Sequence, residues 1–277
     1  MLSVTGSIKT TGWLSDLGFV DFAGSTIVHS VGGWIALAAV LILGPRIGKY
    51  SDANKGKFTG SSFPLAVLGT LILWFGWFGF NGGSNGAMDE TVPLILINTF
   101  LAASAGLVLS SIMGIYVMKK PEPMFMITGP IAGLVSITAS CAYVEPTEAI
   151  IIGSIGGIVS GSGILLLEKI KVDDVVSAVP VHLFAGTWAT IAVAIFGDLE
   201  PMGNETSIAD QLYIQLIGIV SVGAFCFVSA FSIFFVINLF FRLRVNKVEE
   251  DMGLNISEHN ASTATHELLQ VLNKQQE

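Results

Sequence analysis

Long apolar runs, separated by short polar segments, dominate the pattern of hydrophobic and polar positions along the chain. Runs of roughly 20 apolar residues are long enough to cross a ~30 Å hydrocarbon core as helices. They are too long and too continuous for the strands of a membrane barrel, the other fold that satisfies backbone groups in lipid. The pattern therefore predicts an all-α, polytopic membrane helix bundle with seven spans, at about 23–44, 62–80, 92–117, 124–142, 148–167, 175–196 and 213–241.

Basic residues are distributed unevenly between the connecting segments. They follow the first, third, fifth and seventh spans, whereas segments 81–91, 143–147 and 197–212 contain acidic residues and no Lys or Arg. Because basic loops stay on the cytoplasmic side, this alternation predicts a cytoplasmic C-terminus and an outer N-terminus, in the cell (inner) membrane. Residues 1–20 carry no signal peptide, as we expect of a chain whose upstream spans are missing through fragmentation, truncation or a late start.

Composition adds few constraints to this picture. The net charge of −8 comes mainly from the outer loops and the tail, and it does not suggest a nucleic-acid partner. Cys141 and Cys226 both fall in apolar spans and are interpreted as packing residues. Gly153, Gly157 and Gly161 form two GxxxG steps that favour close helix packing within one subunit, with a ligand-facing surface as the alternative.

Two of the four histidines, His29 and His182, lie inside apolar runs. An ionisable group at membrane depth suggests a functional site, and imidazole suits proton or ammonium chemistry because it titrates near neutral pH. Counting residues at ~1.5 Å of rise each puts both at similar depth, in different spans. We expect them to hydrogen-bond each other and line a narrow pore; a structural role for each is the alternative. Pro180 should disturb the helix beside His182.

Polar and aromatic residues near the outer ends of the first two spans are further candidates. Asp21 begins the first span, where it either caps the helix or holds negative potential that favours a cation; the sequence supports both equally. The run from Trp74 to Ser84, WFGWFGFNGGS, ends the second span. It fits an aromatic belt at the membrane interface, or a cation–π surface and gate above a pore.

Four segments together resemble the ammonium transporter family (Amt/Mep/Rh): DFAGSTIVH, WFGWFGFNGGS, VDDVVSAVPVHLFAGTWA and LRVNKVEEDMGLNISEHNAS. The resemblance covers about residues 11–262 and implies seven transmembrane helices of an eleven-helix fold, the first four spans being absent. By resemblance, His29 and His182 are the twin histidines of the pore, and Asp21 is the acid near the outer recruitment site. The remaining implied site residues are Trp77 on the pore wall, Phe80 as a gate, Ser84 at the outer ammonium site, and Asn81 and Asp174 as supporting residues.

The resemblance also implies a function. Ammonium would be recruited at the outer mouth, deprotonated and passed along a hydrophobic pore, by a protein that is not an enzyme and needs no cofactor or metal. The implied partners are ammonium or ammonia, membrane lipid, two further copies in a homotrimer and a PII-type regulatory protein on the cytoplasmic face. Ser25 replaces the second glycine of the family's DFAGG, and the missing spans would have formed much of the wall around His29.

The tail leaves an alternative function open. Residues 1–244 are expected to form the transmembrane domain and 245–277 a cytoplasmic tail, with a linker helix from about residue 262. Such a helix would suit an ammonium sensor that signals to an output domain; a frayed helical end is the other interpretation. A retinal photoreceptor is excluded because span 213–241 has no lysine, and a membrane metalloenzyme because the chain has no HExxH.

Overall fold

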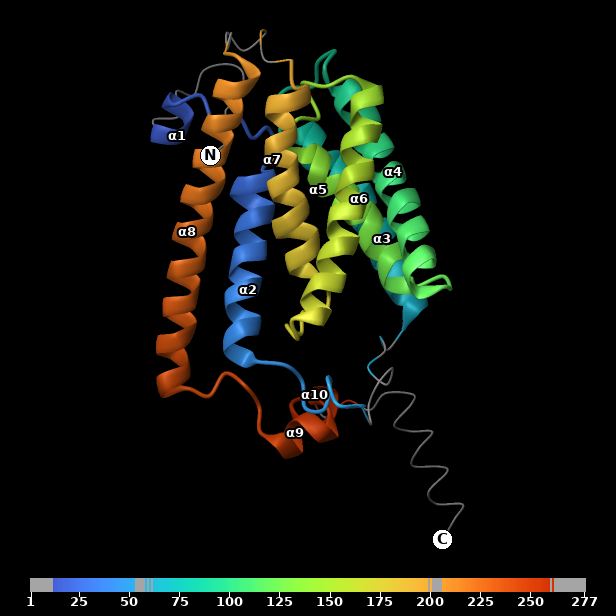
Figure 1. Ribbon diagram of the computed structural model, residues 1–277, viewed down its shortest axis with the longest axis vertical. Helices are drawn as coiled ribbons and strands as arrows, with labels where there is room; N and C mark the ends of the chain where they lie inside the picture. The colour runs from blue at the N-terminus through green and yellow to red at the C-terminus, as the bar shows by residue number, and fades with distance from the viewer. Residues whose placement is uncertain are drawn as a thin grey trace.

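The computed structural model describes residues 12–52, 58, 60, 62–198, 200, 206–259 and 261, which contain helices and no strand. The long helices run side by side along the long axis of the molecule (Figure 1). Their order is α1 (Trp13–Asp16), the π-helical turn η1 (Ser25–Ser30), α2 (Val31–Leu43), α3 (Phe63–Gly83), α4 (Val92–Met118), α5 (Pro123–Thr138), α6 (Pro146–Lys169), the π-helical turn η3 (Val179–Phe184), α7 (Ala185–Phe196), α8 (Ile208–Phe240), α9 (Lys247–Met252) and α10 (Leu254–Ser257).

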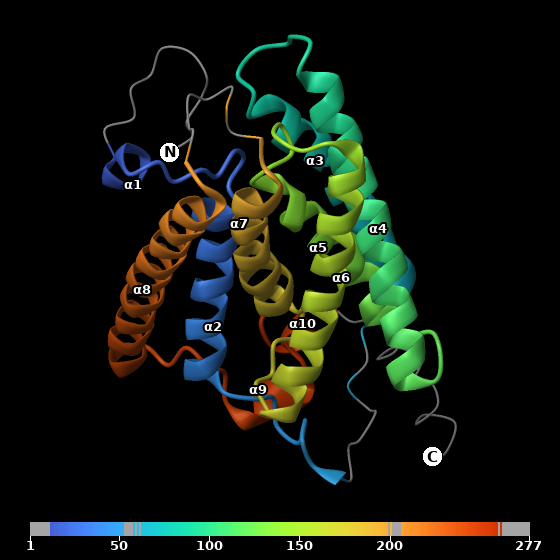
Figure 2. The ribbon, with the colours of Figure 1, turned by 45° about the horizontal axis from the view of Figure 1, so that its top comes forward.

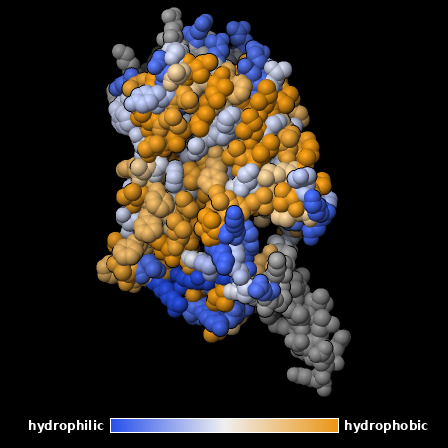
Figure 3. Space-filling view, viewed as in Figure 1, coloured by the Kyte–Doolittle hydropathy of each residue, from blue (hydrophilic) through white to orange (hydrophobic). Residues whose placement is uncertain are grey.

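The predicted all-α membrane bundle is confirmed. Six helices of the described residues are long and apolar enough to cross a membrane, and a shorter apolar helix, Pro123–Thr138, corresponds to the remaining predicted span, 124–142. The turns η1 and η3 continue directly into α2 and α7, so each pair forms one span. Hydrophobic side chains cover the middle of the face drawn in Figure 3, and hydrophilic side chains gather toward its two ends.

The predicted span 124–142 is too long, because α5 stops at Thr138. The carbonyls of Thr138 and Ala139 accept hydrogen bonds from the N–H groups of Ala23 and Phe22, each at 3.0 Å. A distant segment thus supplies the partners for the end of this helix. Irregular backbone is tolerated at membrane depth where protein buries it, and Thr138 is fully buried.

Close helix approach through glycines joins α4, α5 and α6. A Cβ on Gly133 or Gly153 would collide with the backbone of Ala102, and one on Gly157 would meet the backbone of Gly106. The GxxxG steps on α6 therefore serve packing within the chain, as predicted. Two groups of helices result, one around α4, α5 and α6 and another in which α8 packs on α2 and α7 (Figure 2).

One end of the bundle carries the helices α9 and α10 (Figure 1) and is here named the basic end. Arg46 and Lys49, which follow α2, and Arg244, which follows α8, belong to the segments at this end. Arg244 forms hydrogen bonds with both carboxylate oxygens of Glu250, and Glu250 Oε1 accepts the N–H of Ile47 at 2.7 Å. The described part of the tail is thereby joined to the segment after α2. The tail helix predicted from residue 262 lies outside the described residues.

Candidate functional site

Asp21 organises the turn that carries His29. Its Oδ1 accepts the N–H of Ser25 at 2.7 Å, and its Oδ2 accepts the N–H groups of Thr26 and Ile27, both at 2.9 Å. The residue at the N-cap position is Gly24, at φ +109°. Asp21 therefore caps η1 from four residues upstream, so the capping role is right although the predicted cap position is not. Both oxygens of its carboxylate accept backbone hydrogen bonds, and the side chain is buried.

The turn that carries His182 is organised in a similar way from the basic end. Asp174 Oδ2 accepts the N–H of Val179, the first residue of η3, at 2.7 Å. Pro180 lies in the first turn of this π-helical segment, in line with the disturbance predicted there. A Cβ on Gly33 of α2 would meet the backbone of Leu183 at 2.5 Å. The absence of a side chain at Gly33 therefore lets the two histidine-bearing spans touch.

The structure brings His29 and His182 together. Their ring centroids are 5.3 Å apart with the planes at 15°, a stacked arrangement. Nε2 of His29 and Nδ1 of His182 are buried and have no hydrogen-bond partner among the described residues. No hydrogen bond joins the two rings within that set, so the rings stack where the sequence analysis expected a direct bond.

Two aromatic side chains of α3 complete a cluster around His29. Trp77 stacks on His29 at 4.8 Å between ring centroids, and Phe80 lies 5.4 Å from the same ring. The Trp77 indole N–H donates to Thr138 Oγ1 at 2.9 Å, which fixes the plane of the ring. We name His29, His182, Trp77 and Phe80 the ring cluster. It contains four of the eight predicted site residues and joins η1, η3 and α3.

The other predicted residues lie beside this cluster. Asn81 is buried and donates from Nδ2 to Thr99 of α4 at 2.9 Å, while its Oδ1 has no partner among the described residues. Ser84 donates its hydroxyl proton to the carbonyl of Phe80 at 2.8 Å. Asp21 and Asp174 accept hydrogen bonds from backbone N–H groups of η1 and η3, the turns that carry His29 and His182. Three or more His, Cys, Asp or Glu side chains do not meet as a metal site anywhere in the described part of the chain.

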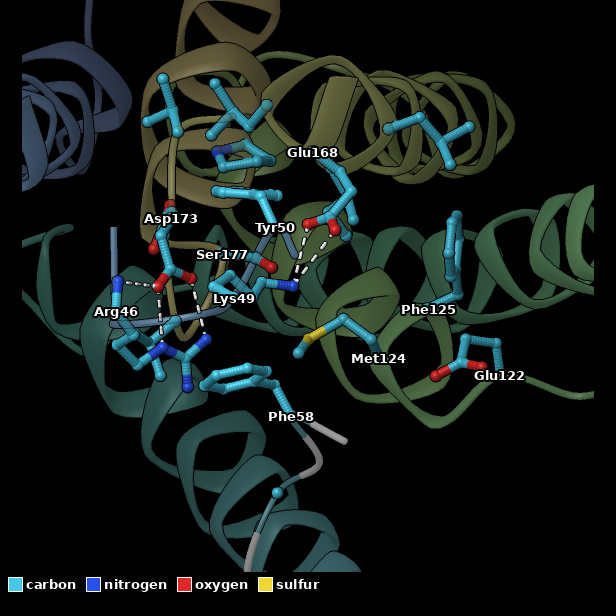
Figure 4. Close-up of a pocket in the computed structure, with 18 of the residues that line it drawn as sticks. Arg46, Lys49, Tyr50, Phe58, Glu122, Met124, Phe125, Glu168, Asp173 and Ser177 are labelled. Atoms are coloured by element: carbon cyan, nitrogen blue, oxygen red, sulfur yellow. Dashed lines mark hydrogen bonds and ion pairs between the residues drawn. The ribbon is translucent and has the colours of Figure 1, made fainter. Parts of the chain in front are cut away.

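A cavity of about 580 Å³ opens at the basic end, beside the segment that leads into η3 and carries Asp173 and Ser177 (Figure 4). Asp174, Ser177 and Pro180 line it together with two ion pairs. Arg46 binds Asp173 with Nε at 2.7 Å, and Lys49 Nζ lies 3.1 Å from Glu168. The cavity therefore lies between the residues that precede His182 and the basic surface.

Local charge and burial perturb two groups in this cavity. Burial raises the pKa of Asp173, but the hydrogen bonds and charge of Arg46 outweigh it, so the pKa lies below its usual value. Burial raises the pKa of Tyr50 to about 12, and the carboxylates of Glu168 and Asp173 add to the effect. Both Asp173 and Tyr50 therefore keep their ordinary charge near neutral pH.

The family follows from comparison of the sequence with known families. Residues 5–264 match the model described as the Ammonium Transporter Family. The chain belongs to the ammonium transporter family. It is 43% identical to the ammonium transporter Amt2 of Archaeoglobus fulgidus over 90% of its own length and 58% of that protein.

Solved ammonium transporter structures have the same fold. A structure titled Sensor Amt Protein superposes with a TM-score of 0.85 at 41% identity, over 91% of this chain and 63% of the other. Candida albicans Mep2 gives a TM-score of 0.77 at 31% identity, over 87% of this chain and 55% of that one. The chain spans about half the length of the curated relatives it matches. These relatives are transport proteins rather than enzymes.

The predicted site of this ammonium transporter family member omitted several polar residues that hold the ring cluster. Thr138 accepts a hydrogen bond from the Trp77 indole N–H, and the hydroxyls of Thr26 and Thr190 are hydrogen-bonded to each other. Gln215 of α8 accepts from the N–H of Val20 and donates to the carbonyl of Val20. All four lie inside or beside apolar helices. A search of the apolar runs for uncharged polar side chains, and not only for ionisable ones, would have found them, because such groups need partners in lipid.

Proposed function

We propose that the protein carries ammonium across the membrane by binding it at the end of the bundle opposite the basic end, removing its proton and passing neutral ammonia beside His29 and His182. One observation carries the proposal: two imidazole rings from different spans stack at 5.3 Å, and an α3 aromatic ring stacks on one of them. Uncharged imidazole offers both a donor and an acceptor nitrogen. The two unpartnered ring nitrogens can therefore exchange hydrogen bonds with ammonia as it passes.

Binding at the outer mouth must replace part of the hydration of ammonium. Aromatic faces attract such cations by ~0.5–2 kcal/mol, and Phe80 and Trp77 offer these faces next to His29. The Ser84 hydroxyl donates its hydrogen bond to the Phe80 carbonyl, so the lone pairs of its oxygen remain available to accept from an ammonium N–H. Asn81 supports the site by holding α3 on α4 through Thr99.

Deprotonation explains how the substrate crosses. A cation in an apolar pore loses hydration at a cost of several kcal/mol, whereas neutral ammonia avoids most of it. The released proton is taken up by the imidazole pair and leaves beside Asp174 into the basic-end cavity. Two charged rings 5.3 Å apart would repel by about 3 kcal/mol at an effective dielectric of about 20. The pair therefore takes up one proton more easily than two, which suits a relay. Potassium has no proton to give up and is rejected.

Orientation and partners extend this proposal. The basic end faces the cytoplasm by the positive-inside rule, in a cell (inner) membrane, with a transmembrane domain over 1–244 and a tail over 245–277. Assembly as a homotrimer within lipid and docking of a PII-type protein at the basic end follow from the family resemblance. The accessibility of a cysteine introduced at Ser51 or at Ser84 tests the orientation. An impermeant reagent added outside should label the cysteine at position 84 and not the one at position 51.

The experiment that tests transport uses the purified full-length protein in proteoliposomes. An inward ammonium gradient should evoke a current or an internal pH change that an equal potassium gradient does not. His29→Ala and His182→Ala should lose this selectivity. Transport with unchanged selectivity in either variant would refute the proposed pore.

An ammonium sensor is the second candidate function. It is favoured by the similarity to the structure titled Sensor Amt Protein, at 41% identity. The sequence of the gene beyond the codon for Glu277 tests it, because an output domain is required for signalling. Ammonium binding seen as a thermal shift, with no flux in proteoliposomes, would favour the sensor over the transporter.

A further inference from the structure

Gln215 is a buried amide and the eighth residue of the membrane-length helix α8. It contacts the segments that carry the two pore histidines through backbone groups. Helix α8 buries only five of its 33 residues: Gln211, Gln215, Gly218, Gly223 and Ala230. Apolar side chains gain little by leaving lipid for another helix, so polar and small residues determine how α8 docks. Gln215 is fully buried on this face.

All four hydrogen-bonding positions of the Gln215 amide are occupied. Oε1 accepts the N–H of Val20 at 3.0 Å and an N–H of Gln211 at 3.2 Å. Nε2 donates to the carbonyl of Val20 at 2.6 Å and to the carbonyl of Thr190 at 3.2 Å. The orientation of the amide is unambiguous, since a backbone N–H can only donate and a carbonyl can only accept. Gln215 thus binds both backbone groups of one residue and a second helix at once.

Each partner of Gln215 leads to one of the pore histidines. Val20 immediately precedes Asp21, whose carboxylate caps η1 and so sets the start of the turn that carries His29. Thr190 belongs to α7, which continues directly from η3, the turn that carries His182. The Thr190 hydroxyl is also bonded to Thr26 of η1. One amide therefore fixes the Asp21 segment and the His182 helix relative to each other.

We propose that Gln215 is a positioning residue for the histidine pair: its amide sets the stacking of His29 on His182 by joining Val20 to α7. The inference rests on the proposed function in so far as the stacking determines selectivity for ammonium. General docking of α8 is the competing role, and Gln211 offers a matched comparison. Gln211 is the same residue type on the same face, equally buried, and it donates to the Gly18 carbonyl at 3.1 Å. Gln211 also donates to Gln215 Oε1 at 3.2 Å, so its replacement removes one of the four Gln215 bonds and leaves those to Val20 and Thr190 in place.

The test compares Gln215→Met and Gln211→Met in the full-length protein. Gln215→Glu is a second variant, which keeps the acceptor for the Val20 N–H but loses the NH₂ group that donates to the carbonyls of Val20 and Thr190. The first readout is the ratio of ammonium-evoked to potassium-evoked current in proteoliposomes. Displacing a reacting group by about 1 Å costs on the order of a hundredfold, so Gln215→Met should lower the ratio by about tenfold to a hundredfold. Gln215→Glu should lower the ratio as well, and Gln211→Met should keep it, because the bonds from Gln215 to Val20 and Thr190 remain.

The second readout does not depend on transport. The chain has four histidines, so ¹⁵N-labelled imidazole signals are few enough to assign. Gln215→Met should move the signals of His29 and His182 and leave those of His259 and His266, whereas Gln211→Met should move none. Wild-type signals and selectivity in Gln215→Met, or equal changes in Gln211→Met, would overturn the inference. A wild-type protein without ammonium-selective current, but with histidine signals that respond to Gln215→Met alone, would refute the proposed transport and leave the positioning role standing.

Discussion

Replacing Asp21 by Asn separates the two roles that the sequence allows for this residue. The carboxylate accepts three backbone N–H groups, one on Oδ1 and two on Oδ2. An amide has one acceptor oxygen, which can keep the bonds to Thr26 and Ile27. Its NH₂ group then faces the N–H of Ser25, a fully buried residue that is left without an acceptor. The change therefore breaks the cap even though the side chain keeps its shape.

The magnitude follows from these bonds. A buried N–H without a partner costs about 1–3 kcal/mol. The two bonds that remain lose their charge assistance, roughly half their strength, or about 0.5–1 kcal/mol each. The total is about 2–5 kcal/mol, which corresponds to a fall in the unfolding temperature on the order of 5–15 °C for a chain of this size.

The assay is thermal unfolding of the purified protein in detergent, side by side with the wild type and with Asp16→Asn. Asp16 is exposed on α1 and loses the same charge without a backbone cap, so its replacement should leave the unfolding temperature unchanged. If Asp21→Asn unfolds at the wild-type temperature and only ammonium uptake falls, Asp21 acts through its charge at the mouth, and the capping argument is refuted.

Three other changes test separate parts of the structure. Thr138→Val removes the acceptor of the Trp77 N–H, should cost about 1–3 kcal/mol and should change the tryptophan fluorescence; an unchanged spectrum would contradict the bond. Gly153→Leu should prevent folded protein from accumulating because its side chain enters the backbone of Ala102, whereas Gly76→Ala, with open space around it, should be tolerated in the same extraction and gel-filtration test. Arg46→Met removes the group that lowers the pKa of Asp173. The stabilisation by a lowered carboxyl pKa is present above the unfolded value of about 3.9 and is lost as pH falls through the folded value, so unfolding curves should show a deficit at pH 7 that shrinks below about pH 4.

Much of the fold follows from local pattern. Apolar runs are a property of neighbouring residues, so they located six membrane-length helices and the shorter α5. The alternation of basic and acidic connections is equally local, and it predicted the orientation. The early end of α5 could not be predicted in this way. The stretch 124–142 contains no charged residue to mark an end, and the N–H groups of Phe22 and Ala23 that bind the end of the helix belong to a segment more than 100 residues away.

The ring cluster likewise contains residues that the sequence pattern indicates and depends on residues whose role only tertiary packing reveals. His29 and His182 stand out because ionisable residues are conspicuous in apolar runs, whereas Trp77 and Phe80 were assigned their places by the family resemblance. The capping of η1 by Asp21 was predictable in kind, since a carboxylate next to a helix start seeks N–H groups. The partners that fix the cluster were not, because Thr138, Thr190 and Gln215 are ordinary polar residues whose importance depends on which backbone groups tertiary packing brings to them.

The central claim is that His29 and His182 act together to let ammonia pass while cations that cannot lose a proton are rejected. The most direct measurement is the ratio of ammonium to potassium current through the full-length protein and its His182→Ala variant in proteoliposomes. The account predicts a strong preference for ammonium in the wild type and a large loss of that preference in the variant. An equal preference in both proteins would show that the stacked histidines do not select the substrate.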